Sequence, residues 1–210
     1  MTYYYQHPRP DLMISALRAM SKEGWLKKEN SKAPVAAFLA RLLSANADRW
    51  DRWTKDLTGE TEDEKSIFTV ALWMGNDESC RKALAGLLRG GDPAFKQEAS
   101  QLLEKRPPNL LGDDIDSPQF LDALWGSFLA TGDERYVQRL ISTLPLLDRK
   151  DDIMKMLIGG AAKWSLTSNA VQHPKVMEIC EAELKVLPEN QKPALMEVIE
   201  SARKRKNSTN

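Results

Sequence analysis

The apolar residues of this chain recur every three or four positions along most of its length. Near the N-terminus the repeat is formed by Leu12, Met13, Ala16, Leu17 and Met20. Past the middle of the chain it is formed by Leu121, Leu124, Trp125 and Phe128. Such spacing places one apolar stripe on each helix and leaves its other side polar. No strand-length window alternates strictly between apolar and polar residues, so the pattern predicts an all-α protein.

The repeat and its interruptions predict about nine to eleven helices. The segments lie near residues 10–22, 33–45, 47–57, 62–74, 78–89, 93–105, 118–130, 134–145, 151–170, 174–187 and 191–205. Two helices joined by a short link pack as antiparallel neighbours. The expected fold is therefore all-α and built of stacked antiparallel helical hairpins, either an α-solenoid-like stack or an irregular multi-helix bundle.

Several of these boundaries carry side chains that cap helices. Thr61 followed by Glu64 is a capping box, in which the hydroxyl accepts from an early backbone N–H and the carboxylate reaches back to the cap. Asp92-Pro93 and Ser117-Pro118 place a capping residue before a proline at the first helical position. The missing N–H of proline costs nothing there.

The longest interruption of the helical pattern is RPPNLLGDDIDS, residues 106–117. Its two prolines and its glycine oppose helix formation. We expect a single all-α domain over residues 1–210. This linker is its one plausible internal boundary, between stacked halves at residues 8–106 and 117–205.

Residues 66–88 can be aligned with residues 122–144. In both, a bulky helix is expected to end at a left-handed glycine, Gly75 or Gly132, and an amphipathic helix returns. A new cap follows each glycine, Asp77 or Asp133. The Gly-Asp turn and the helix pairing resemble tetratricopeptide and HEAT-type repeats over two hairpins. The resemblance implies stacked hairpins, but it points to no specific family and assigns no functional residue.

The charge balance bears on possible partners. Lys plus Arg and Asp plus Glu both number 30, so the formal net charge is +0, and no global field draws the chain onto nucleic acid or an anionic membrane. No apolar stretch approaches the ~20 residues that span a bilayer. We interpret the basic run at 203–206 as cations favoured by a helix C-terminus, followed by a frayed end, because no aromatic platform accompanies it. We expect neither a nucleic-acid nor a membrane partner.

The ends and the cysteines bear on cellular location. MTYYYQHPRP at the N-terminus has no apolar core and no small-residue cleavage site, so we expect no signal peptide and a cytoplasmic location. A signal removed beforehand would leave no trace in this sequence. Cys80 and Cys180 match no metal-ligand spacing and are expected to be free, buried thiols, although a single disulfide between them stays open.

The candidate chemical groups favour structural interpretations. His173 precedes Pro174 and is expected at a helix cap, and Cys180 lies about 10 Å further along the axis, too far for a nucleophile–base pair. The acidic cluster of residues 113–116 lacks the central glycine and the closing glutamate of a calcium loop. We therefore expect no catalytic residue, no metal and no cofactor.

The most unusual segment is GGAAKWSLTSNAVQHP, residues 159–174. Its small residues let another helix approach closely, and a row of neutral hydrogen-bonding side chains follows. One interpretation is a packed internal helix whose polar groups bond backbone and caps. The other is a groove that recognises a peptide or a protein. The candidate binding residues are Trp164, Ser165, Ser168, Asn169 and His173, with Trp125 as a further tryptophan that would mark a contact surface if exposed.

These observations lead to two hypotheses of different class. The first is a non-enzymatic interaction or scaffold module with a protein or peptide partner, because stacked hairpins form extended surfaces that hold other chains. The alternative is an all-α hydrolase or transferase whose groups are dispersed over facing helices. Self-assembly through an uncapped apolar end would add a homo-oligomer.

Overall fold

The computed structural model describes residues 1–56, 61–90 and 93–209, and within these residues it contains helices and no strand. The all-α prediction is therefore confirmed. Each predicted segment overlaps a helix, with ends that differ by up to four residues. The stacked-hairpin arrangement itself stays a prediction. Among the described residues no helix is both long enough and apolar enough to cross a membrane.

The chain divides into two compact units, which are described separately. The first comprises Met1–Asn109 and Gly126–Gly132, and the second comprises Leu110–Trp125 and Asp133–Asn210. Helix α7 (Pro118–Thr131) contributes residues to both units. The predicted halves at residues 8–106 and 117–205 stay a prediction.

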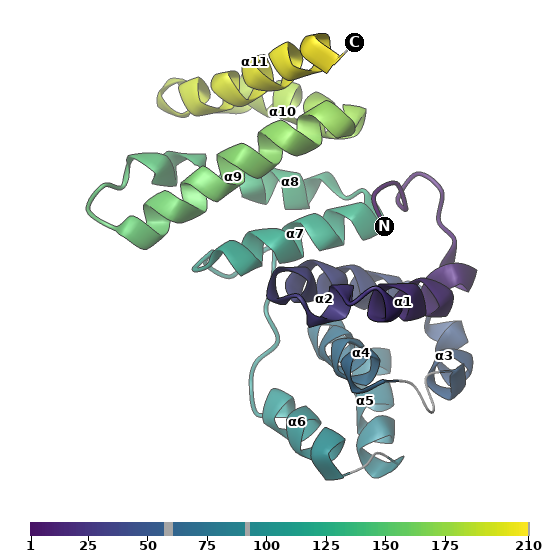
Figure 1. The fold of residues 1–210 in the computed structure, drawn as a ribbon. Coiled ribbons are helices and arrows are strands. Elements are labelled where there is room, and N and C mark those ends of the chain that lie inside the picture. The colour runs from purple at the N-terminus through teal and green to yellow at the C-terminus, as the bar shows by residue number, and fades with distance from the viewer. Residues whose placement is uncertain (57–60, 91–92, 210) are drawn as a thin grey trace. The chain divides into compact units, whose positions relative to one another are not determined.

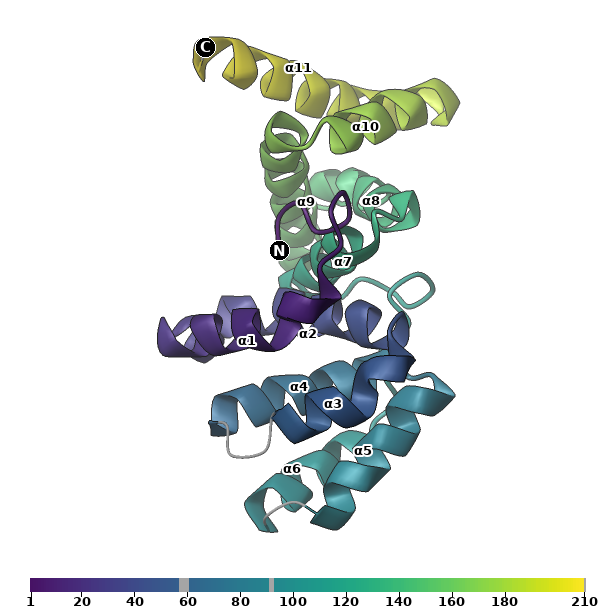
Figure 2. The ribbon, with the colours of Figure 1, turned by 90° about the vertical axis from the view of Figure 1, so that its right-hand side faces the viewer.

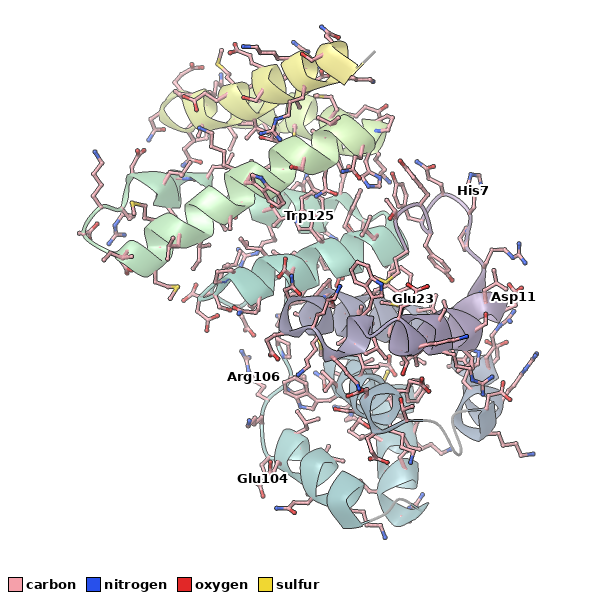
Figure 3. The ribbon with its side chains drawn as sticks, viewed as in Figure 1. His7, Asp11, Glu23, Glu104, Arg106 and Trp125 are labelled. Carbon is pink, nitrogen blue, oxygen red and sulfur yellow. The ribbon has the colours of Figure 1, made fainter. Side chains whose placement is uncertain are left out.

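The first unit is organised around helix α4. Its helices are α1 (Met13–Lys22), α2 (Glu29–Ser44), α3 (Trp50–Asp56), α4 (Glu62–Gly75), α5 (Glu78–Gly90) and α6 (Pro93–Leu103), with short 3-10 helices η1 (Pro10–Leu12), η2 (Trp25–Lys27) and η3 (Ala47–Arg49). Helix α4 packs against α1, α2, α5 and α6, and α5 packs against α6 (Figure 2). Phe38 and Leu43 of α2 and Phe68 and Leu72 of α4 are buried in this core. Figure 3 labels Glu104 and Arg106, where the chain leaves α6.

The second unit is organised around helix α9. Besides the first part of α7 it contains α8 (Glu134–Ile141), η4 (Leu144–Asp148), α9 (Ile153–Gln172), α10 (Pro174–Val186), η5 (Glu189–Gln191) and α11 (Lys192–Thr209). Helix α9 packs against α8, η4, α10 and α11, and α10 and α11 lie side by side (Figures 1 and 2). Leu140, Ile158, Leu166 and Leu195 are fully buried there.

Three of the predicted caps, Thr61, Asp77 and Asp133, accept a backbone hydrogen bond at the start of their helices. The Thr61 hydroxyl accepts from the backbone N–H of Glu64 at 3.4 Å. The Asp77 carboxylate accepts from the backbone N–H of Cys80 at 2.7 Å, and Asp133 likewise caps α8. Helix α7 begins at Pro118, as predicted. The Asp92 cap lies outside the described residues.

One predicted left-handed glycine is wrong and the other is confirmed. Gly132 has a φ of 68°, as expected at the end of α7. At the end of α4, however, Asn76 takes the left-handed conformation with a φ of 54°. Asparagine tolerates this region because its short polar side chain bonds locally. Gly75 is needed for space instead, since the Sγ of Cys80 lies where a Cβ would stand.

Two predicted helix ends are also wrong. Helix α2 begins at Glu29, four residues before the start predicted near residue 33, and it contains Pro34. An internal proline removes one backbone hydrogen bond, and α2 retains extensive packing against α4. Helix α11 continues to Thr209, where a frayed end was expected. Its last turns carry the cations that a helix C-terminus favours.

A candidate binding face on helix α9

Helix α9 has a capping residue at each end, Asp152 at its start and His173 at its end. The side chain of Asp152 accepts from the backbone N–H of Lys155 at 3.1 Å and so satisfies one donor of the first turn. At the other end, the backbone N–H of His173 donates to the carbonyl of Asn169 at 2.8 Å. Pro174 then begins α10, so His173 occupies the predicted cap position.

One side of α9 is fully packed within the second unit. Ile158, Ala162, Leu166 and Ala170 follow one another at intervals of four residues, and all are buried. Gly159 belongs to this side, and a Cβ built on it would lie 2.5 Å from the backbone nitrogen of Leu147 in η4. Gly159 thus lets η4 approach α9 closely. A close approach of another helix was predicted from the small residues of this segment.

The opposite side of α9 exposes large apolar side chains. Ile153 is 70% exposed, Leu157 53% and Trp164 67%. At 3.6 residues per turn these three positions fall on one line along the helix. Met154 and Met156 lie beside them and are also exposed. Single exposed apolar residues are ordinary, but a contiguous group on one helix indicates a contact surface.

Gly160 lies on the same line, between Leu157 and Trp164. A Cβ built on it would meet nothing within 4 Å. Glycine inside a helix costs about 1 kcal/mol relative to alanine, and nothing around this position in the second unit requires its small size. Together with this glycine, the exposed side chains form what we call the α9 stripe: Ile153, Met154, Met156, Leu157, Gly160 and Trp164.

A hollow of about 480 Å³ lies at the C-terminal end of α9. Its lining comes from α9 and α11 and consists of Ser168, Val171, Gln172, Lys204, Arg205 and Ser208. Val171 falls on the line of Trp164, seven residues further along the helix, so the stripe leads into the hollow. The lining contains two cations and no carboxylate, which favours an anionic group.

The predicted polar row divides into residues bonded within α9 and a residue of the hollow. The Ser165 hydroxyl donates to the carbonyl of Ala162 at 3.1 Å. The Asn169 amide donates to the carbonyl of Ser165 at 2.9 Å. Such bonds to a helix's own backbone are the ordinary way to satisfy these side chains. Ser168 instead lines the hollow, so Trp164 and Ser168 are the candidates that border the exposed face.

Trp125 and His173 lie away from this face. Trp125 is on α7 (Figure 3) and is 7% exposed. His173 is 1% exposed, and its burial lowers the pKa of the imidazole below the ordinary value. Both side chains are buried, and neither offers accessible surface to a partner.

Ile153, Met154, Met156 and Leu157 were not predicted as exposed residues from the sequence. Apolar residues at helical spacing were assigned to the core as a class. A signal was present, because these four residues and Ile158 form a partial ring of about 200° around the first turns of α9, wider than one packed side of a helix. A helix that packs on one side buries only part of such a ring, so some of its members had to be exposed.

The thiols and acids form no reactive centre in the described residues. Cys80 and Cys180 are free and buried. Burial raises the pKa of Cys180 to about 12 and that of Cys80 to about 11, so both are thiols rather than nucleophilic thiolates near neutral pH. No group of three or more His, Cys, Asp or Glu residues is arranged to hold a metal in the described part of the chain.

Comparison of the chain with protein-family models, with curated proteins and with solved structures gives no match. The α9 stripe and the adjoining hollow must therefore be interpreted from their own chemistry.

Proposed function

We propose that this protein is a non-enzymatic interaction module, which acts by docking a helix of another polypeptide chain onto the α9 stripe. The observation that carries the proposal is the exposed row of Ile153, Leu157 and Trp164 on a helix whose other side is fully packed. Burying one large apolar side chain contributes about 1.5–3 kcal/mol. Tryptophan is also among the residues most often found at the energetic centre of interfaces.

Gly160 favours a helical occupant. With nothing within 4 Å of its missing side chain, this position lets a second backbone approach α9 as η4 approaches it at Gly159. Close helix packing at small residues increases the contact made by the larger side chains on either side. The intrinsic cost of a glycine inside a helix is then offset in the complex.

The enzyme alternative gains no support from the hollow. Its lining has serines and a lysine but no carboxylate, histidine or cysteine, so it contains neither a Ser–His nor a Cys–His pair of nucleophile and base. We also propose a cytoplasmic location, since two free thiols suit a reducing compartment.

The test is capture of partners from native lysate with the purified, tagged chain. We expect a specific enriched protein with the wild type and its loss with Trp164→Ala. Trp25→Ala is the matched control, because Trp25 is 45% exposed but belongs to the first unit. Asn169→Ala tests the polar row separately.

Each variant must retain the helical circular dichroism of the wild type. Equal capture by the wild type and Trp164→Ala, or the absence of any enriched protein, would contradict the proposed function.

A further inference from the structure

The two ends of the α9 stripe differ in charge. At the N-terminal end, residues 148–155 contain three acids and three cations, which balance. At the C-terminal end, residues 156–172 of α9 contain one cation and no acid, and residues 201–209 of α11 contain four cations and no acid. The single cation of that part of α9 is Lys163, which pairs with Glu197 of α11. The stripe is therefore neutral at one end and positive at the other, where the hollow lies.

Lys204 is a cation of this end that a partner can use. It lines the hollow, and no ion pair or side-chain hydrogen bond joins its ammonium group to another residue that the structure describes. Arg203, by contrast, pairs with Glu181 at 2.7 Å, and Arg205 takes part in an interaction of its own. The nearest acid along α11, Glu200, comes one turn before Lys204 and does not line the hollow.

A hydroxyl group accompanies this cation on the α9 side of the hollow. Ser168 lines the hollow, and within the described part of the chain its side chain makes no hydrogen bond. Ser165, Thr167 and Asn169 of the same helix each donate to a backbone carbonyl about one turn earlier. The hollow thus combines an ammonium group with a hydroxyl donor, and a carboxylate is an acceptor that suits both.

From these features we infer that the partner is an amphipathic helix of a different protein, whose apolar side covers the α9 stripe and whose acidic end places carboxylates in the hollow. This inference rests on the proposed function and names the chemistry of its partner. Ser168 lies about 6 Å and Gln172 about 12 Å along the axis beyond Trp164. The acids of the partner are therefore expected one to two turns beyond the side chain that covers Trp164.

The orientation of the partner follows from its own dipole. Acids are favoured in the first turn of a helix, so we expect the partner helix to begin at the hollow and to run antiparallel to α9. A second copy of this chain does not supply such an end, because its own stripe has one neutral end and one positive end. A nucleic acid supplies phosphates, but it has no row of aliphatic side chains to cover Ile153 and Leu157.

Selection from a displayed peptide library tests the inference with the full chain as bait. Each peptide is an amphipathic helix with leucines at the spacing of the stripe, and the turns at both of its ends vary equally among Glu, Gln and Lys. We expect the wild type to enrich Glu over Lys by about tenfold or more in the N-terminal turns, because hydrogen bonds between charged groups are strong. Lys204→Glu is expected to reverse the preference to Lys. Lys206→Glu is the matched control, because Lys206 is on the same turn of α11 but does not line the hollow, and it is expected to keep the preference for Glu.

The dissociation constant of one enriched peptide, labelled with fluorescein and measured by fluorescence anisotropy, then separates the contributions. Lys204→Glu is expected to weaken binding about tenfold at low salt, and added salt is expected to reduce this difference. Ser168→Ala removes one hydrogen bond and is expected to weaken binding about threefold. Trp164→Ala is expected to weaken the enriched peptide and a counterpart with Gln in place of Glu by the same factor, because it acts on the apolar side alone.

Three results would overturn the inference. They are a wild type that enriches no peptide, enriched peptides without a preference for Glu in their N-terminal turns, and a preference that Lys204→Glu leaves unchanged. The proposed function is tested apart from it by capture from lysate. Capture that depends on Trp164 leaves the interaction module standing when the acidic partner fails.

Two other occupants give distinct results, and each would also overturn the inference. A poly-thymidine oligonucleotide that binds through Lys204 and ignores Trp164→Ala would assign the hollow to nucleic acid. A dimer of the wild type in light scattering that Trp164→Lys dissociates would assign the stripe to a second copy of this chain.

Discussion

Two neighbouring glycines in α9 have opposite surroundings. A Cβ at Gly159 would lie 2.5 Å from the backbone of Leu147, whereas a Cβ at Gly160 would meet nothing within 4 Å. Gly159→Ala is therefore expected to destabilise the fold by about 1–3 kcal/mol through overpacking. Gly160→Ala is expected to stabilise the monomer by about 0.5–1 kcal/mol through helix propensity.

Urea unfolding measures both changes, with each substitution made in a Trp164→Lys background so that self-association does not contribute. A stabilising Gly159→Ala would show that the described packing of η4 on α9 is wrong, and a destabilising Gly160→Ala would show that position 160 is not open.

His173 gives the second unit a dependence on pH. Burial lowers its pKa below the ordinary 6.5, so the folded chain holds the imidazole neutral. Between the folded pKa and 6.5 the unfolded chain binds more protons, and the free energy of unfolding falls as the pH falls through this window. A His173→Gln variant is expected to lose this slope, measured by urea unfolding between pH 7.5 and 5.5. An unchanged slope would assign the dependence to other groups.

Asp77 caps the start of α5, and its replacement is expected to affect stability through this one helix end. Asp77 accepts from the backbone N–H of Cys80 at 2.7 Å and from its thiol at 3.2 Å. Replacing such a cap by alanine costs about 1 kcal/mol, while asparagine also caps well. Asp77→Ala is expected to lower the urea midpoint and Asp77→Asn to lower it less. Equal losses for the two variants would point to the charge rather than the cap.

At the scale of the element, the side chains of the α9 stripe are expected to contribute to binding and little to the stability of the fold. Ile153, Leu157 and Trp164 are largely exposed, so the monomer gains little from their apolar surface. Leu157→Lys and Trp164→Lys are expected to change the free energy of unfolding of the monomer by less than about 0.5 kcal/mol. Thermal unfolding of dilute protein measures this change. A large loss of stability would place these side chains in the core.

The elements also show what a sequence pattern can predict. Apolar periodicity and caps such as Thr61 and Asp133 located the helices, because both depend on neighbours within a turn or two. The pattern placed the start of α2 near residue 33, whereas the helix begins at Glu29, because tertiary packing as well as local pattern decides where a helix begins. Trp164 and Ser168 were singled out from the sequence as residues of an unusual segment, and their role in binding stays a prediction. The exposed side of Ile153 and Leu157 was missed, because exposure depends on which helices pack against α9.

At the scale of the molecule, each compact unit contains one cysteine. Cys80 belongs to the first unit and Cys180 to the second, and both are fully buried. A thiol reagent reaches either sulfur only when the surrounding unit opens. Labelling followed by mass spectrometry of the two peptides therefore reports the opening of each unit separately, without any added probe. If the units unfold as one, the two sulfurs will be modified at the same rate, and Asp77→Ala will accelerate both.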